Sequence, residues 1–233
     1  MKPWQVKQWA AAAAVIPEAS ADFVCAMEEV LDEYQQVYDE KYPRVCLDES
    51  PKQLISETRQ VYVDEKGVEY TDFEYKREGV VDMYMIVEPL GGKREVLIKD
   101  SHDRFNWAHA ITHISEQMYP EAEQITLIQD NLSAHKPSAL YEIHPPEKAR
   151  QILKRFRFVF TPKHGSWLNI AECELSVLTR QGVKQRVASK EELIKQVTQW
   201  YENRNLKQRK VDWQFTSKQA RVKLKRLYPT VIT

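Results

Sequence analysis

Two aspartates stand where chemistry is expected in an α/β protein, each just after a short apolar run. Asp48 follows residues 45–47 (VCL), and Asp130 closely follows residues 125–128 (ITLI). Both runs are typical of buried strands, and ligand sites in open sheets lie beyond strand ends. Two carboxylates brought together repel each other unless a cation lies between them, and hard oxygen ligands favour Mg²⁺. The alternative for each aspartate alone is a turn residue that ends its strand.

A third carboxylate is expected from the helix predicted near residues 168–182. Glu172 and Glu174 are both candidates. They lie at the two opposite edges of the apolar face of that helix, so each could face a site beside the core. Periodicity therefore does not choose between them. The plain alternative is that both are solvated acids on the helix surface. The arc consists of Leu168, Ala171, Leu175, Leu178 and Val183.

The elements that position these acids predict an α/β fold. The order is a strand, a hairpin, a helix, a strand, a helix, a strand and then helices. Antiparallel strands first and parallel βα units later imply a mixed five-stranded sheet with helices on both faces. The predicted strands are residues 45–47, 82–89, 94–98, 125–128 and 156–160, and the main predicted helices are residues 103–118, 168–182, 190–203 and 216–226.

The first forty residues are predicted to be helical and peripheral. Pro17 followed by Glu18 is a favourable helix opening, and Phe23, Met27 and Val30 then recur at helical spacing. We interpret residues 1–41 as a helical connector and residues 42–233 as the catalytic domain with its C-terminal helices.

Composition narrows the class of protein. Hydrophobic residues make up 42% and charged residues 29% of the 233 residues, as in soluble globular proteins. No apolar run approaches the ~20 residues that a bilayer span needs, so no membrane partner is expected. The three cysteines show no paired spacing, which fits a reducing, cytosolic setting.

Charge is unevenly distributed although the net charge is zero. Residues 18–40 contain eight acids and no base, whereas residues 201–233 contain nine bases and two acids. Such asymmetry is typical of a phosphate-facing surface, although solvated helix faces explain a single cluster equally well.

Three blocks of sequence contain the candidate acids and their neighbours: residues 46–50 (CLDES), residues 129–131 (QDN) with His135, and residues 161–172 (TPKHGSWLNIAE). Together they resemble the catalytic blocks of mariner-related bacterial transposases of the insertion sequence 630 family. The match extends through residues 56–60, 141–146 and 212–215. The combination is specific, whereas any one block would be weak.

The resemblance implies a ribonuclease-H-like fold and an Asp48, Asp130, Glu172 triad, with Glu174 a bystander. It implies two-metal phosphoryl transfer with Mg²⁺ or Mn²⁺, in which Asp48 bridges both ions while Asp130 and Glu172 each hold one. The implied reaction is cut-and-paste transposition: cleavage at inverted-repeat ends of double-stranded DNA and strand transfer to a target, typically TA. Self-association on DNA and a bacterial cytoplasmic, nucleoid-associated location follow from the same resemblance.

The same blocks supply candidate nucleic-acid contacts. They are His135, His164, Trp167, Lys163 and Asn131. The plain alternatives are that the two histidines are ordinary loop residues, that Trp167 packs in the core, and that Asn131 satisfies backbone groups in a turn. The first forty residues lack the helix-turn-helix pattern that precedes the catalytic domain in full-length relatives. Two other functions stay open: a nuclease that no longer moves DNA, and an inactive or domesticated remnant that binds DNA or a partner.

Overall fold

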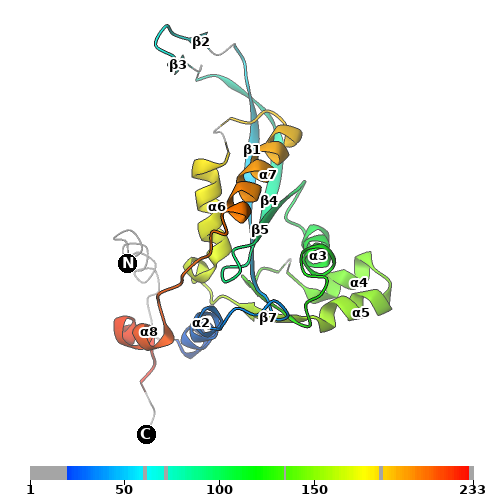
Figure 1. The fold of residues 1–233 in the computed structure, drawn as a ribbon, viewed down its shortest axis with the longest axis vertical. Helices are drawn as coiled ribbons and strands as arrows, with labels where there is room; N and C mark the ends of the chain where they lie inside the picture. The colour runs from blue at the N-terminus through cyan, green and yellow to red at the C-terminus, as the bar shows by residue number, and fades with distance from the viewer. Residues whose placement is uncertain (1–19, 60–61, 71–72, 134, 184–185, 231–233) are drawn as a thin grey trace.

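The computed structural model describes residues 20–59, 62–70, 73–133, 135–183 and 186–230 (Figure 1). Its main sheet has five strands in the order β5-β4-β1-β6-β7. β4 pairs antiparallel with β1 and β5, whereas β6 pairs parallel with β1 and β7. The predicted mixed five-stranded sheet is therefore confirmed. The strands are β1 (Arg44–Glu57), β4 (Tyr75–Val87), β5 (Arg94–Lys99), β6 (Ile125–Gln129) and β7 (Phe156–Phe160).

Helices cover both faces of this sheet, and each face has its own apolar core. One core includes side chains of α2, α6, α7 and α8, and the other includes side chains of α3, α4 and α5. The α-helices are α2 (Ala21–Tyr34), α3 (Arg104–His113), α4 (Leu140–Ile143), α5 (Pro146–Lys154), α6 (Ile170–Gln181), α7 (Lys190–Leu206) and α8 (Ser217–Lys223). A π-turn (Ile114–Met118) extends α3, and short 3₁₀ turns are η2 (Pro137–Ala139), η3 (Ser166–Leu168) and η4 (Lys225–Leu227). None of the described helices is both long and apolar enough to cross a membrane.

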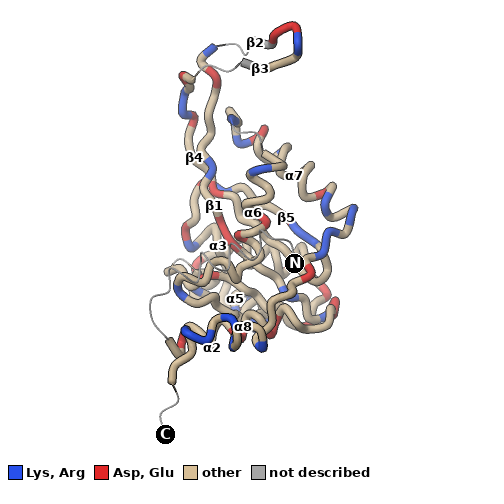
Figure 2. The backbone as a smooth tube through the Cα atoms, turned by 90° about the vertical axis from the view of Figure 1, so that its left-hand side faces the viewer, with Lys and Arg blue, Asp and Glu red and all other residues tan. Residues whose placement is uncertain are grey.

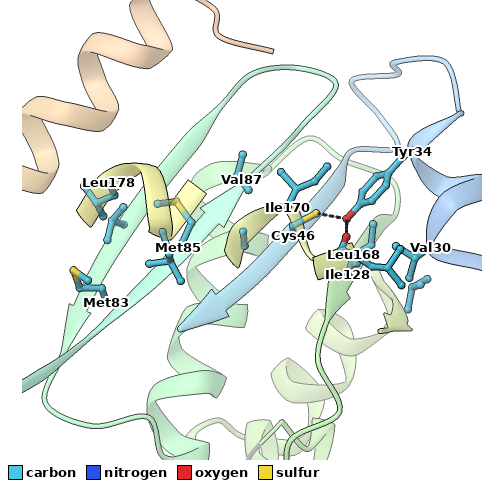
Figure 3. Packing of buried hydrophobic residues seen from close by; sticks show 14 of the residues in the cluster. Val30, Tyr34, Cys46, Met83, Met85, Val87, Ile128, Leu168, Ile170 and Leu178 are labelled. Atoms are coloured by element: carbon cyan, nitrogen blue, oxygen red, sulfur yellow. Dashed lines mark hydrogen bonds between the residues drawn. The ribbon is translucent and has the colours of Figure 1, made fainter. Parts of the chain in front are cut away.

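The helix α2 belongs to the core, so the expectation of a peripheral helix is wrong for this part of the connector. Ser20 caps it by accepting from the backbone N–H of Phe23 at 3.3 Å. The Tyr34 hydroxyl donates to the carbonyl of Leu168 at 2.7 Å and lies 3.3 Å from the sulfur of Cys46 (Figure 3). Three α2 side chains are fully buried: Met27, Val30 and Leu31. The expected opening at Pro17 lies outside the described residues, and the division after residue 41 stays a prediction.

The strand β1 is longer than predicted, and Asp48 does not end it. Its parallel pairing with β6 stops at Cys46, opposite Ile128, but its antiparallel pairing with β4 continues to Glu57. The two strands leave the sheet together as a hairpin arm (Figure 1). At its tip, β2 (Tyr62–Val63) and β3 (Glu69–Tyr70) pair as a small separate sheet. This arm was missed because its exposed residues lack an apolar pattern.

Candidate active site

The three predicted acids line one cavity of about 510 Å³. Asp48 comes from β1, Asp130 follows β6, and Glu172 lies in the first turn of α6. Elements far apart in the chain therefore bring these residues to one place. The lining residues are Asp48, Glu49, Ser50, Asp130, Thr161, Ser166, Asn169, Glu172, Leu175, Ser176, Thr179 and Arg180.

Strand alternation places Asp48 in this cavity. Cys46 packs in the core that contains α6, and Leu47 packs in the core on the opposite face. Because side chains alternate along a strand, Asp48 returns to the α6 side. Asp48 also lies just past the end of the parallel pairing, where β6 no longer pairs with β1, although the strand itself continues to Glu57.

Burial and neighbouring acids perturb Asp48. Burial raises the pKa of its carboxyl to about 7, and the negative charges of Glu49, Asp130 and Glu172 also raise it. The backbone N–H of Glu49 donates to Asp48 Oδ1 at 2.9 Å and opposes these effects on the pKa. A divalent cation would offset this repulsion. Three carboxylates around one cavity thus form a donor set whose chemistry fits Mg²⁺ or Mn²⁺.

The carboxylates are not closed around a common point. Among residues 20–230 that the structure describes, no group of three or more His, Cys, Asp or Glu side chains is gathered closely enough to hold a metal ion. The two-metal arrangement that the resemblance implies is therefore not formed by these side chains as they lie in this structure. The side chain of Glu172 is exposed, and exposed side chains exchange between staggered rotamers.

His135 is paired with two acids and does not face solvent. Its Nδ1 lies 2.8 Å from Asp130 Oδ1, its Nε2 lies 2.9 Å from Glu49 Oε1, and its side chain is 1% exposed. Burial alone would lower the pKa of His135, but its hydrogen bonds and the charges of Asp130 and Glu49 raise it to about 10. The ring stacks on Trp107 with centroids 5.9 Å apart, and Trp107 Nε1 donates to Gln129. His135, whose Nδ1 also lies 3.3 Å from the backbone carbonyl oxygen of Asp130, is therefore placed to orient Asp130. Its burial disfavours the expected direct DNA contact, which stays a prediction.

Glu172 and Glu174 have separate environments, which periodicity did not reveal. Glu172 is exposed and lines the cavity with Asp48 and Asp130. Glu174 is buried and pairs with Arg94 and Arg204, each at 3.1 Å. The structure thus groups Glu172, and not Glu174, with the two aspartates.

Asn169 connects the two elements that carry Asp48 and Glu172. Its side-chain oxygen accepts from the backbone N–H of Ala171 at 3.1 Å and caps α6, and its amide donates to the carbonyl of Leu47 at 2.9 Å. Asn169 was not among the residues predicted to have a role. Its signal was the preference for asparagine before a helix.

The other expected nucleic-acid contacts differ in exposure. Asn131, Lys163 and His164 are exposed, and His164 adopts a left-handed backbone conformation with φ of 64°. Their loops adjoin Asp130 and Thr161 at the cavity, so these three stay candidates. Trp167 is half-buried and packs edge-on against Phe215 with centroids 6.4 Å apart, which favours the packing alternative.

The sheet order, with helices on both faces, is the ribonuclease-H-like arrangement of the Mos1 transposase catalytic domain. The chain belongs to the DDE superfamily endonucleases, whose family model matches residues 43–194. A search of curated proteins finds no significant match.

Solved structures of the Mos1 mariner transposase share this fold. The paired-end complex with left transposon end has a TM-score of 0.54 at 13% identity, covering 83% of this chain and 60% of that one. The paired-end complex with Mn has a TM-score of 0.53 at 14% identity, covering 80% of this chain and 57% of that one. The strand transfer complex gives 0.52 at 14% identity, covering 78% and 53%. This chain thus spans somewhat more than half the length of those proteins.

Proposed function

We propose that this chain catalyses metal-dependent DNA strand cleavage and strand transfer as the catalytic domain of a cut-and-paste transposase. The observation that carries the proposal is the cavity that Asp48, Asp130 and Glu172 line together. Membership of the DDE endonucleases supports nuclease chemistry, and likeness to Mos1 complexes with Mn and with Mg supports a divalent metal. Assignment to the bacterial insertion sequence 630 family, self-association, a TA target and a cytoplasmic, nucleoid-associated location belong to the same proposal.

The three acids would hold Mg²⁺ or Mn²⁺. The bound metal would supply activation of the attacking oxygen and stabilisation of the leaving oxygen in an in-line phosphoryl displacement. The chain's own residues orient the acids. His135 fixes one oxygen of Asp130, and the amide of Asn169 sets α6 against the strand that carries Asp48. The exposed Lys163 and His164 lie on a loop at the cavity rim, where they would contact DNA phosphates.

Cleavage of inverted-repeat duplex DNA with Mg²⁺ tests the proposal. Asp48→Asn should abolish cleavage and leave the melting temperature close to wild type or higher, because it removes a carboxylate whose charge is disfavoured. The matched control is Asp100→Asn, since Asp100 pairs with Lys190 and does not line the cavity. Cleavage by Asp48→Asn at the wild-type rate, with contaminating nuclease excluded, would disprove the assigned chemistry.

A further inference from the structure

A second hollow, separate from the carboxylate cavity, lies between α6 and α7. Its volume is about 740 Å³, and it shares no lining residue with the first cavity. Glu174 and Gln181 border it from the side of α6 opposite Glu172 and Ser176, as the helical angle of 100° per residue requires. Its lining residues are Glu174, Gln181, Gly182, Gln196, Gln199, Trp200, Asn203, Arg204, Lys207, Arg209 and Lys210.

The charges around this hollow are unbalanced. Its single acid, Glu174, is already paired with Arg94 and with Arg204. Lys207 and Arg209 are exposed, and neither side chain has an ion pair or hydrogen bond with another residue that the structure describes. Lys210 Nζ lies 5.5 Å from the ring centre of Tyr38 and forms no ion pair with a residue that the structure describes, although its charge acts on Glu88. The hollow therefore presents an excess of positive charge.

The segment that carries these cations is fixed in place. The backbone N–H of Arg209 donates to the carbonyl of Arg204 at 3.2 Å, and that of Val211 donates to the carbonyl of Pro89 at 2.9 Å. The fully buried Arg94 donates through Nη2 to the carbonyl of Arg209 at 2.6 Å. Asn205 adds two bonds to the Arg94 backbone, at 2.9 and 2.7 Å. The cations thus stand on an ordered segment that is anchored to the core.

One base of the same C-terminal stretch that does not line the hollow, Arg221, is already paired with an acid of this chain. Arg221 donates to both carboxylate oxygens of Glu28, at 2.8 and 2.6 Å. Figure 2 shows both basic and acidic residues along α7. Three bases of this stretch that form no ion pair with a described residue, Lys207, Arg209 and Lys210, therefore line the hollow, whereas the exposed Lys218, Lys223, Lys225 and Arg226 lie outside it.

We propose that this hollow binds the phosphodiester backbone of duplex DNA outside the catalytic cavity. Cations held on an ordered segment, beside the amide donors of Gln199 and Asn203, suit a polyanion whose phosphate oxygens only accept hydrogen bonds. The inference rests on the proposed function in taking DNA as the ligand. It adds a contact that would hold the duplex without reading its sequence, because phosphate contacts position and base contacts specify.

Binding of a random-sequence duplex, measured by fluorescence anisotropy in EDTA at several salt concentrations, tests the proposal. The test variant is Lys207→Ala/Arg209→Ala. The charge-matched control is Lys218→Ala/Lys225→Ala, which changes two exposed bases of the same stretch that do not line the hollow. Each lost phosphate contact reduces the magnitude of the negative slope of log K against log salt by about 0.9. The test variant should therefore reduce the magnitude of this slope by about 2, and the control should leave the slope near the wild-type value.

Equal effects of the two variants would overturn the proposal, because they would show general electrostatic attraction. An unchanged slope in the test variant would overturn it as well. Thermal melting of both variants checks that the fold is retained. Because the assay excludes divalent metal, it reports on the hollow independently of cleavage. Loss of cleavage in Asp48→Asn with normal DNA binding would support the proposed function. The salt dependence of DNA binding by the Lys207→Ala/Arg209→Ala variant separately decides whether the hollow binds DNA.

Discussion

Replacing Glu174 and Glu172 separately by alanine should give opposite results, although the two acids are two residues apart on α6. Glu174 is buried and contacts Arg94, whose side chain is 0% exposed. Burial lowers the pKa of Arg94, and the charge of Glu174 raises it. Glu174→Ala leaves that guanidinium buried without its carboxylate, a change that costs about 3–5 kcal/mol. For a chain of this size the melting temperature should fall by roughly 6–20 °C.

Glu172→Ala removes an exposed side chain, so its effect on stability should stay within about 0.5 kcal/mol. It should nevertheless abolish cleavage, because Glu172 lines the cavity with Asp48. Urea unfolding and cleavage assays on both variants, with cleavage measured well below the melting temperature of Glu174→Ala, give the comparison. A stability loss below about 1 kcal/mol for Glu174→Ala would refute the argument. So would a folded Glu174→Ala that cleaves no better than Glu172→Ala.

Three further predictions concern orientation, pH and metal. His135→Gln should lower cleavage about 10–100-fold and raise the Mg²⁺ concentration needed, because Asp130 loses its orienting partner; unchanged metal dependence would contradict this. Burial raises the pKa of Glu88 from 4.5 to about 7, so stability should fall as pH rises between these values. Glu88→Gln should then stabilise the protein on the order of 3 kcal/mol at pH 8 and little at pH 4, as melting curves at both pH values would show. Cleavage should occur with Mg²⁺ or Mn²⁺ and be lost with Ca²⁺, whose larger, looser shell suits in-line geometry poorly; Ca²⁺-supported cleavage would count against the metal assignment.

Buried elements could be predicted closely from sequence. β7 has the predicted bounds, and β5 and β6 each extend one residue further, because continuous apolar runs mark buried strands. The arm formed by β1 and β4 could not be predicted, since the first six residues of β4 are exposed and carry no alternating pattern. The packing of α2 was also missed, because an apolar helix face does not reveal which surface covers it.

The site could be predicted in part. Asp48 and Asp130 were identifiable because each follows an apolar strand core. The burial of His135 depends on Glu49, 86 residues away in the sequence, and no local pattern reveals such a contact. The choice between Glu172 and Glu174 likewise depended on Arg94, a residue of a distant strand. Long-range charge pairing, and not periodicity, decides which carboxylates are available for chemistry.

The hydrogen bond from Asn169 to the carbonyl of Leu47 makes one side of the cavity mechanically stiff. Leu47 directly precedes Asp48, and Asn169 caps the helix turn that ends in Glu172. A shift of α6 along the sheet would stretch this bond, so the bond opposes relative movement of strand and helix. The gap between these two acids is then adjusted by side-chain torsions, of which glutamate has one more than aspartate. The shorter side chain of Asp48 therefore holds its carboxylate close to the strand, whereas the longer side chain of Glu172 can move its carboxylate over a greater distance.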